Sequence, residues 1–320
     1  MISKLLTLWL FAFAFTVGAA KAEVRSATGE FVDTARQRTV PWRIYYDQSL
    51  PGPRPVLIAS HGLGGSRDNL GYLARHLAGN GFVTVHIQHA GSDKGIRQGH
   101  PFRSREARRL TALSLRTIDN AVNRYLDIPF VVQALSGLNK GNGLFAGRLN
   151  MQQLGMFGHS YGAKSVLIAA GQMMGVLGNY NFPEPAIKAA VALSPGAPRT
   201  QLTMDQVFAD VKIPLFHITG TQDRSPVQQI DPVSRQLPFR HIPAGHQYLL
   251  VLDKADHMTF SGHRVGTPQQ KPDDTRHVSL IQNSVLAFFQ THLLDDAKAG
   301  QWLKTEFPKQ LDRSDTFETR

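Results

Sequence analysis

The sequence predicts an α/β fold in which a mostly parallel sheet of about eight strands carries helices on both faces. Short apolar runs alternate with helical stretches along nearly the whole chain, which is typical of parallel strands joined by crossover helices. Several of these runs are apolar throughout, as in strands that are buried on both faces. Within its 320 residues the chain has no internal repeat and no low-complexity linker. We therefore expect a single domain over residues 23–320.

The first strands are expected near the beginning of that domain. Residues 36–47 (RQRTVPWRIYYD) alternate well enough for an edge hairpin strand, and the turn cluster SLPGPRP separates them from the next strand. Residues 55–60 (PVLIAS) and 82–90 (FVTVHIQHA) are short apolar runs, and the stretch between them is typical of a helix that ends at Asn80-Gly81. These segments predict a β-α-β unit.

The alternation continues toward the C-terminus. Two segments fit it least well, 92–112 and 171–186, and both follow elements whose C-terminal ends should border an active site. We interpret them as cap-like or pocket-wall insertions. Further strands are expected at 154–158, 187–194, 211–220 and 246–255, and helices at 104–137, 161–174 and 275–294.

The first residues predict a secretory signal peptide. Lys4 supplies a positive charge, the apolar run LLTLWLFAFAFTVGAA follows it, and Ala20-Lys21-Ala22 matches the small-residue cleavage pattern. We expect cleavage before Glu23, removal of residues 1–22, and export to the periplasm or the medium without stable membrane insertion. The alternative is an uncleaved anchor, although the apolar run is short for a bilayer span.

The composition and charge of the chain exclude some kinds of site and favour some kinds of partner. The chain has no cysteine, which excludes disulfides, a thiol nucleophile and thiolate metal ligands. Its formal net charge of +11 favours anionic surfaces or substrates. A cluster of basic residues has only Phe102 as an interleaved aromatic, so we interpret it as a solvated insertion near a site mouth and expect no nucleic-acid partner. The cluster consists of Lys94, Arg97, Arg103, Arg105, Arg108, Arg109 and Arg116.

One serine is bracketed by two glycines between an apolar run and a helix, in Gly158-His159-Ser160-Tyr161-Gly162. A sharp strand-to-helix turn strains the backbone, and glycine two positions before and after removes Cβ atoms that would clash there. Such a turn presents the hydroxyl of Ser160 above the sheet edge, with the positive end of a helix beneath it. A capping serine in an ordinary turn is the alternative, but the flanking strand and helix favour a nucleophile.

A serine hydroxyl is a weak nucleophile and needs a base that a carboxylate holds in the right tautomer. Catalytic groups of parallel sheets lie on loops at the C-terminal ends of strands. Asp223 lies in such a loop after the strand at 211–220, and His257 follows the strand at 246–255. The chain order Ser160, Asp223, His257 is one of the known orders of a serine triad.

Other carboxylates and histidines compete for these roles. Asp253 and Asp256 are so near His257 in sequence that neither can easily reach its far ring nitrogen, and the loop after 187–194 offers no carboxylate. We expect the rival histidines to be surface or structural residues. They are His241, His246 and His263.

Acyl transfer also needs two N–H donors for the oxyanion of its tetrahedral intermediate. One is expected to be the main-chain N–H of Tyr161, directly after the nucleophile. The second is expected to be the N–H of Leu63 in the loop His61-Gly62-Leu63-Gly64-Gly65, where glycines let the main chain approach a substrate. A flexible turn has the same composition, but its occurrence beside the Ser160 motif favours the donor loop.

Four stretches together resemble the secreted serine esterases of the α/β-hydrolase superfamily. The branch is the one called dienelactone-hydrolase-like or related to platelet-activating-factor acetylhydrolases and polyester hydrolases. The stretches are PVLIASHGLGGSRDNLGYLARHLAGNGFVTVHIQHAGSD, GMFGHSYGAKSVL, HITGTQDRSPV and LVLDKADHMTF, and the likeness covers nearly all of 38–295. The resemblance implies hydrolysis of a small-molecule carboxylic ester with no metal or organic cofactor. It also implies a triad of Ser160, Asp223 and His257, with Leu63 and Tyr161 as oxyanion donors.

Two departures from the family pattern bear on the substrate. Dienelactone hydrolases carry a cysteine nucleophile, whereas this chain has Ser160 and no cysteine. Acetylhydrolases of the platelet-activating-factor type place their acid after an earlier strand, where this chain has only SPGAP. Peptidase, amidase and polyester hydrolase activity therefore stay open as alternatives to a simple esterase, and so does a non-catalytic binding protein.

The candidate pocket residues form an apolar set with few charges. Methionine is a flexible filler that suits varied acyl groups, although Met173 and Met174 could equally be core residues. With the basic cluster near the mouth, this composition predicts a permissive esterase for short to medium acyl chains. Besides the two oxyanion donors, the pocket candidates are His61, Met258, Met173, Met174 and Tyr180.

Overall fold

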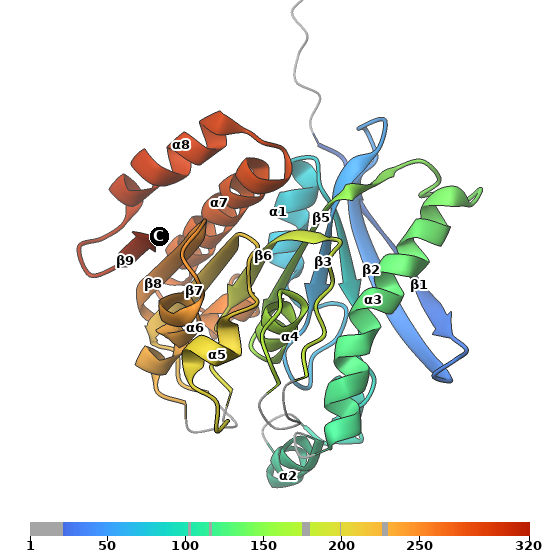
Figure 1. The fold of residues 1–320 in the computed structure, drawn as a ribbon, viewed down its shortest axis with the longest axis horizontal. Coiled ribbons are helices and arrows are strands. Elements are labelled where there is room, and N and C mark those ends of the chain that lie inside the picture. The colour runs from blue at the N-terminus through green and yellow to red at the C-terminus, as the bar shows by residue number, and fades with distance from the viewer. Residues whose placement is uncertain (1–21, 102–103, 115–116, 175–179, 199, 226–229) are drawn as a thin grey trace, which may run out of the picture.

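The structure is a computed structural model that describes residues 22–101, 104–114, 117–174, 180–198, 200–225 and 230–320. These residues form a nine-stranded sheet. The strands are β1 (Val24–Asp33), β2 (Arg38–Asp47), β3 (Arg54–Ser60), β4 (Val83–Ile87), β5 (Leu149–His159), β6 (Ile187–Leu193), β7 (Leu215–Gln222), β8 (Gln247–Asp256) and β9 (Thr316–Thr319). They lie in the order β1-β2-β4-β3-β5-β6-β7-β8-β9 (Figure 1).

Most of the sheet is parallel, as the sequence predicts. Every pairing from β4 through β3, β5, β6 and β7 to β8 is parallel. The edges differ, because β1 pairs with β2, β2 with β4, and β8 with β9 in antiparallel register. The predicted α/β class with a mostly parallel sheet is therefore confirmed.

The strand count exceeds the expected eight because both edge strands have weak sequence patterns. β1 pairs with β2 along its whole length, but it carries few apolar residues and most of its positions are exposed or half-buried. β9 has only four residues, which is too short for a recognisable period, and it is held by pairing with Tyr248–Val251 of β8. The segment predicted as an edge strand at 36–47 is β2, the second strand from that edge.

Helices cover both faces of the sheet (Figure 1). Buried side chains of α3 and α4 pack on one face, and those of α1, α7 and α8 pack on the other. The sheet and its two helical layers agree with the sequence prediction. The helices are α1 (Gly71–Gly79), α2 (Arg105–Ser114), α3 (Ile118–Lys140), α4 (Tyr161–Ala169), α5 (Met204–Phe208), α6 (Leu237–His241), α7 (Asp274–Leu293) and α8 (Ala297–Thr305).

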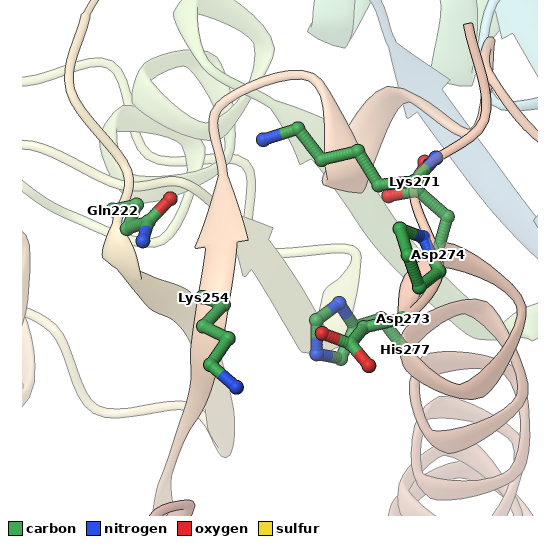
Figure 2. Close-up of a pocket in the computed structure, with 7 residues that line it drawn as sticks. Gln222, Lys254, Lys271, Asp273, Asp274 and His277 are labelled. Atoms are coloured by element: carbon green, nitrogen blue, oxygen red, sulfur yellow. The ribbon is translucent and has the colours of Figure 1, made fainter.

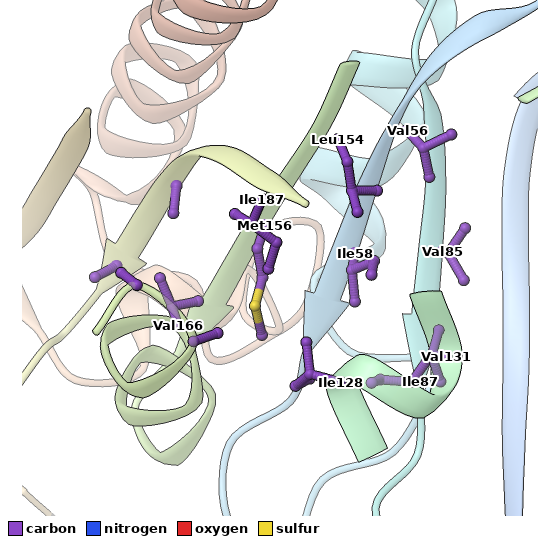
Figure 3. Packing of buried hydrophobic residues seen from close by; sticks show 14 of the residues in the cluster. Val56, Ile58, Val85, Ile87, Ile128, Val131, Leu154, Met156, Val166 and Ile187 are labelled. Carbon is purple, nitrogen blue, oxygen red and sulfur yellow. The ribbon is translucent and has the colours of Figure 1, made fainter. Parts of the chain in front are cut away.

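Strand β3 shows how the two faces are filled. Val56 and Ile58 point into the core under α3 and α4, as Figure 3 shows, whereas Leu57 and Ala59 belong to the core under α1 and α7. Successive side chains of a strand point to opposite faces, so an apolar run throughout supplies both cores at once. This is the physical reason why PVLIAS forms a central strand.

Two predicted helices differ from the observed ones. The stretch expected as one helix over 104–137 contains α2 and α3, which are separate helices. The helix expected over 161–174 is α4, which ends at Ala169 because Gly171 turns the chain with a φ of 119°. A Cβ at Gly171 would lie 2.6 Å from the carbonyl oxygen of Asp210, so the turn is packed tightly.

The parallel strands end at one edge of the sheet, and the loops that leave this edge carry the candidate site. Figure 1 places α2 beyond the same end, and Ser114 of α2 donates a hydrogen bond to the carbonyl of Gly91 in the loop after β4. Within α2 only Ala107 is buried, so its basic side chains surround a largely solvated helix. The predicted insertion 92–112 thus includes most of α2, whereas part of the insertion 171–186 lies outside the described residues.

The predicted signal peptide lies outside the described residues except for Ala22. Among the residues that the structure describes, none of the helices combines the length and apolarity needed to cross a membrane.

Candidate active site

Ser160 occupies the turn that joins β5 to α4. Its backbone has a positive φ of 58° with ψ −113°, and its N–H donates to the carbonyl of Leu193 in β6. A Cβ at Gly162 would lie 1.9 Å from the carbonyl oxygen of Ser60, and a Cβ at Gly158 would lie 2.5 Å from that of Gly162. Positions 158 and 162 therefore have no room for a Cβ atom, which explains why a glycine lies two residues before and two residues after Ser160.

His257 lies directly after β8 and connects Ser160 to Asp223. Its Nε2 is 2.9 Å from Ser160 Oγ, and its Nδ1 is 2.7 Å from Asp223 Oδ1. Asp223 is fully buried and His257 is 6% exposed, so water competes little with these contacts. The three residues that the sequence predicts as a triad are thus brought into one hydrogen-bonded chain.

Asp223 follows β7 and is held in the charged form by its surroundings. Thr219 Oγ1 donates to its Oδ2 at 2.9 Å, and the guanidinium of Arg235 lies 2.9 Å from Oδ1. Burial alone would raise the pKa of Asp223, but its hydrogen bond to His257 and the charges of His257 and Arg235 outweigh burial and lower that pKa. A carboxylate in this state accepts a hydrogen bond from the Nδ1–H of His257 and so fixes the tautomer of the ring.

The sequence did not identify Arg235 or His159 as part of this site. Arg235 is buried, donates to the carbonyls of Asp223 and Ser194, and places Nη2 at 3.2 Å from His257 Nδ1. His159 Nε2 lies 3.0 Å from the carbonyl oxygen of His257, and burial lowers the pKa of His159 well below its usual value. His159 lies within the serine motif, but no pattern in the sequence distinguishes Arg235 from a surface arginine.

The rival residues have partners elsewhere. Asp256 accepts from Arg264 and Lys271, and Asp253 accepts from Thr221. The rival histidines have contacts of their own, which are His241 with Asp205, His263 with Asn69, and His246 with the ring of His292.

The glycine-rich loop after β3 lies beside the serine. A Cβ at Gly62 would lie 3.5 Å from the Cβ of Ser160. The N–H of Gly64 donates to the carbonyl of Ser92 at 2.8 Å, which ties this loop to the loop after β4. This hydrogen bond uses the amide of Gly64, and among the described residues the Leu63 N–H has no acceptor, so Leu63 stays the predicted donor.

Tyr161 is the first residue of α4. The first N–H groups of a helix have no acceptor within the helix, and the helix dipole is positive at this end. Tyr161 is half-buried, and the guanidinium carbon of Arg124 lies 4.6 Å from the centroid of its ring. Burial raises the pKa of the Tyr161 hydroxyl, which stays protonated at neutral pH. The Tyr161 amide directly follows Ser160 at the start of α4 and stays the other predicted donor.

The chain matches no protein-family model and no curated protein sequence. A function must therefore be argued from the arrangement of the chain's own residues.

A buried polar network supports the glycine-rich loop from behind. Nδ1 of His61 donates to the carbonyl of Gly62 at 2.7 Å, and its Nε2 accepts from the N–H of His89 at 3.0 Å. The ring of His89 lies between Ser60 Oγ at 3.0 Å and Asp127 at 2.9 Å. Burial lowers the pKa of His61 well below its usual value and that of His89 to about 4, so both rings are neutral at pH 7. His61 therefore holds the loop in position.

The remaining candidate pocket residues differ in their burial and in their contacts. Met258 follows His257 and is half-buried. Met174 is buried against Tyr125 and Ile168, and a single β-bridge links it to Tyr180, which is 65% exposed. Met173 is half-buried, and its N–H bonds to the carbonyl of Val207. Residues 175–179 lie outside the described residues, so a substrate pocket formed by this segment stays a prediction.

A cavity of about 180 Å³ lies near the start of α7 (Figure 2). Its walls contain none of the residues predicted to bind substrate. Of its lining residues, Lys271 pairs with Asp256, and Asp274 pairs with Arg264, which also binds Asp256. The lining residues are Gln222, Lys254, Lys271, Pro272, Asp273, Asp274 and His277.

The packing around the serine turn predicts that Gly162→Ala is strongly destabilising. Its Cβ would lie 1.9 Å from main-chain oxygen, so the turn must move. We expect a loss of about 3 kcal/mol or more in the free energy of unfolding, together with loss of activity. The control is Gly137→Ala in α3, where a Cβ meets nothing within 4 Å. Urea denaturation of both variants measures the difference, and equal stabilities would contradict the assigned packing.

The ion pairs of Asp256 predict a specific acid sensitivity. Burial raises the pKa of Asp256, but Lys271 and Arg264 outweigh it and lower that pKa to about 2. The unfolded value is about 3.9, so the native state binds fewer protons. The stabilisation, on the order of 2 kcal/mol, is therefore complete well above pH 4 and is lost as the pH falls toward 2. Asp256→Asn should lower the urea midpoint at pH 6 and should converge with the parent toward pH 2. A difference that is the same at every pH would contradict this prediction.

Proposed function

We propose that the chain is a serine hydrolase with the α/β-hydrolase fold that cleaves carboxylic esters through an acyl-enzyme. The observation that carries the proposal is the hydrogen-bonded chain from Ser160 Oγ through His257 to Asp223. Its contacts join residues that are 97 and 34 positions apart in sequence. Buried polar groups cost free energy unless they are paired, and this pairing is the one that moves a proton away from a serine hydroxyl.

The proposed reaction has two steps. His257 Nε2 accepts the proton of Ser160 while Oγ bonds to the ester carbonyl carbon, and the N–H groups of Leu63 and Tyr161 donate to the oxyanion. The imidazolium then protonates the departing alkoxide as the ester C–O bond breaks, which leaves the acyl group on Ser160. In the second step, water gives its proton to His257 and attacks the acyl carbonyl. Collapse of that intermediate releases the acid and restores the serine hydroxyl.

The substrate class that we propose is a small ester with a short or medium acyl chain. The predicted pocket residues Leu63, Tyr161 and Met258 are half-buried and would offer mainly apolar contact to a substrate. The exposed basic helix α2 lies at the same end of the sheet, where it would attract anionic esters. The predicted signal peptide assigns this activity to the periplasm or the medium.

A series of p-nitrophenyl esters of increasing acyl length tests the proposal, alongside a peptide p-nitroanilide and a polyester film. We expect kcat/KM to reach its maximum below about ten acyl carbons. A maximum at longer chains would favour a lipase, faster amide cleavage would favour a peptidase, and faster release from the film would favour a polyester hydrolase. Absence of turnover together with absence of fluorophosphonate labelling would favour a binding protein.

A further inference from the structure

A buried arginine lies behind both predicted oxyanion donors. Arg124 belongs to α3 and is 0% exposed. Its Nε donates to Ser165 Oγ in α4, and its Nη1 donates to Ser92 Oγ in the loop after β4, both at 2.8 Å. Its Nη2 donates to Ser60 Oγ at 2.8 Å and to the carbonyl of His61. One side chain therefore connects four segments that lie far apart in sequence.

Two of these segments carry the predicted donors. The carbonyl of His61 lies two residues before Leu63, and Ser92 also accepts the N–H of Gly64 in the same loop. On the other side, Ser165 Oγ lies 3.2 Å from the carbonyl of Tyr161, and the Arg124 guanidinium stacks on the Tyr161 ring. The guanidinium thus links the glycine-rich loop to the start of α4. The relative position of these two segments determines the distance between the Leu63 and Tyr161 N–H groups.

The charge of Arg124 is not cancelled by a contacting carboxylate. Within the described part of the chain, all of its hydrogen-bond acceptors are neutral oxygens. The nearby carboxylate of Asp127 is instead bound by Arg36, Arg38 and His89. Burial lowers the pKa of Arg124 to about 10, so the guanidinium stays charged at neutral pH. A buried cation of this kind acts strongly on any negative charge that develops nearby.

We propose that Arg124 is a positioning residue for the oxyanion hole. It fixes the spacing of the Leu63 and Tyr161 amides, and its positive charge favours the oxyanion over the neutral ester carbonyl. The alternative is that Arg124 only attaches α3 to the sheet. The two differ in what they predict for catalysis, because a group that favours only the oxyanion changes kcat and leaves KM unchanged.

The experiment compares Arg124→Met and Arg124→Lys with the parent on p-nitrophenyl acetate. We expect Arg124→Met to lower kcat by about 10- to 100-fold with little change in KM, which is less than the cost of removing a donor outright. Arg124→Lys keeps the charge without the planar fork and should recover part of the loss. Binding of a trifluoromethyl ketone, which forms an oxyanion on the serine, should weaken in parallel with kcat.

The matched control is Arg54→Met at the opposite end of β3. Arg54 also donates to a main-chain carbonyl, that of Gly81, but it lies away from the loop. Urea denaturation places all variants on one stability scale. If Arg124→Met does not fold, Arg124→Lys and Ser165→Ala replace it, with a smaller loss of kcat expected for each.

The proposal would be overturned by a folded Arg124→Met variant with the parent's kcat, or by a rise in KM with kcat unchanged. It would also be overturned if Arg124→Lys lost as much kcat as Arg124→Met. The proposal rests on the proposed esterase function, and the two can fail separately. A parent protein that hydrolyses no ester removes the function itself, whereas an active parent with an equally active variant removes only the role of Arg124.

Discussion

Ser160→Ala is expected to abolish ester hydrolysis and to leave the fold intact. The substitution keeps the Cβ and the positive-φ turn but removes the oxygen that lies 2.9 Å from His257 Nε2. We expect kcat on p-nitrophenyl acetate to fall on the order of 10⁶-fold, because the nucleophile is lost and only weaker background catalysis is left. Release of p-nitrophenol measures the rate, and urea denaturation should show a change of less than about 1.5 kcal/mol.

A fluorophosphonate probe sharpens this test, because it bonds covalently to an activated serine. The matched control is Ser136→Ala in α3, which removes a hydroxyl that bonds only within its own helix. We expect the probe to label the parent and the Ser136 variant and to leave Ser160→Ala unlabelled. Equal labelling of Ser160→Ala would assign the reactive hydroxyl to another residue.

His257→Ala is expected to be as damaging as Ser160→Ala, since the serine then has no proton acceptor. Asp223→Asn should lower kcat by about 10⁴-fold, because the neutral amide no longer stabilises the imidazolium and its NH2 group can donate to Nδ1, which favours the wrong tautomer. It also leaves the buried guanidinium of Arg235 without the carboxylate that lies 2.9 Å from it. Stability should therefore fall together with activity in Asp223→Asn.

Two comparisons decide whether these residues act as one unit. The double variant Ser160→Ala/His257→Ala should be no less active than either single variant, as expected when both serve the same step. Asp253→Asn is the control for the acid, since the Asp253 carboxylate contacts Thr221 instead of the site. If Asp253→Asn or Asp256→Asn lowered kcat more than Asp223→Asn, the acid would be misassigned.

The sequence predicted those features that depend on local pattern. β3 and β6 are apolar runs in the sequence and central strands in the structure, and the turn at Ser160 is recognisable because its glycines avoid particular clashes. The positions of Asp223 and His257 followed from one rule, that parallel strands end at a common edge. The α/β class and the relative placement of these residues could therefore be predicted.

Features that depend on distant partners could not be predicted in this way. Arg124 appears in the sequence as one more cation on a helix, and its burial depends on oxygens at Ser60, Ser92 and Ser165. Arg235 likewise acquires its role from Asp223, which is twelve positions away across a loop. An isolated arginine has no periodicity, so pattern alone cannot separate a buried one from a solvated one.

The positive φ of Ser160 also restricts which amino acids can replace it. A positive φ is costly for threonine, whose branched Cβ crowds the main chain, whereas cysteine has the same unbranched shape as serine. An exchange of serine for cysteine is thus compatible with this turn, and an exchange for threonine is not, although threonine keeps the hydroxyl. The backbone geometry of this turn therefore restricts which nucleophile it can carry, independently of the reactivity of that nucleophile.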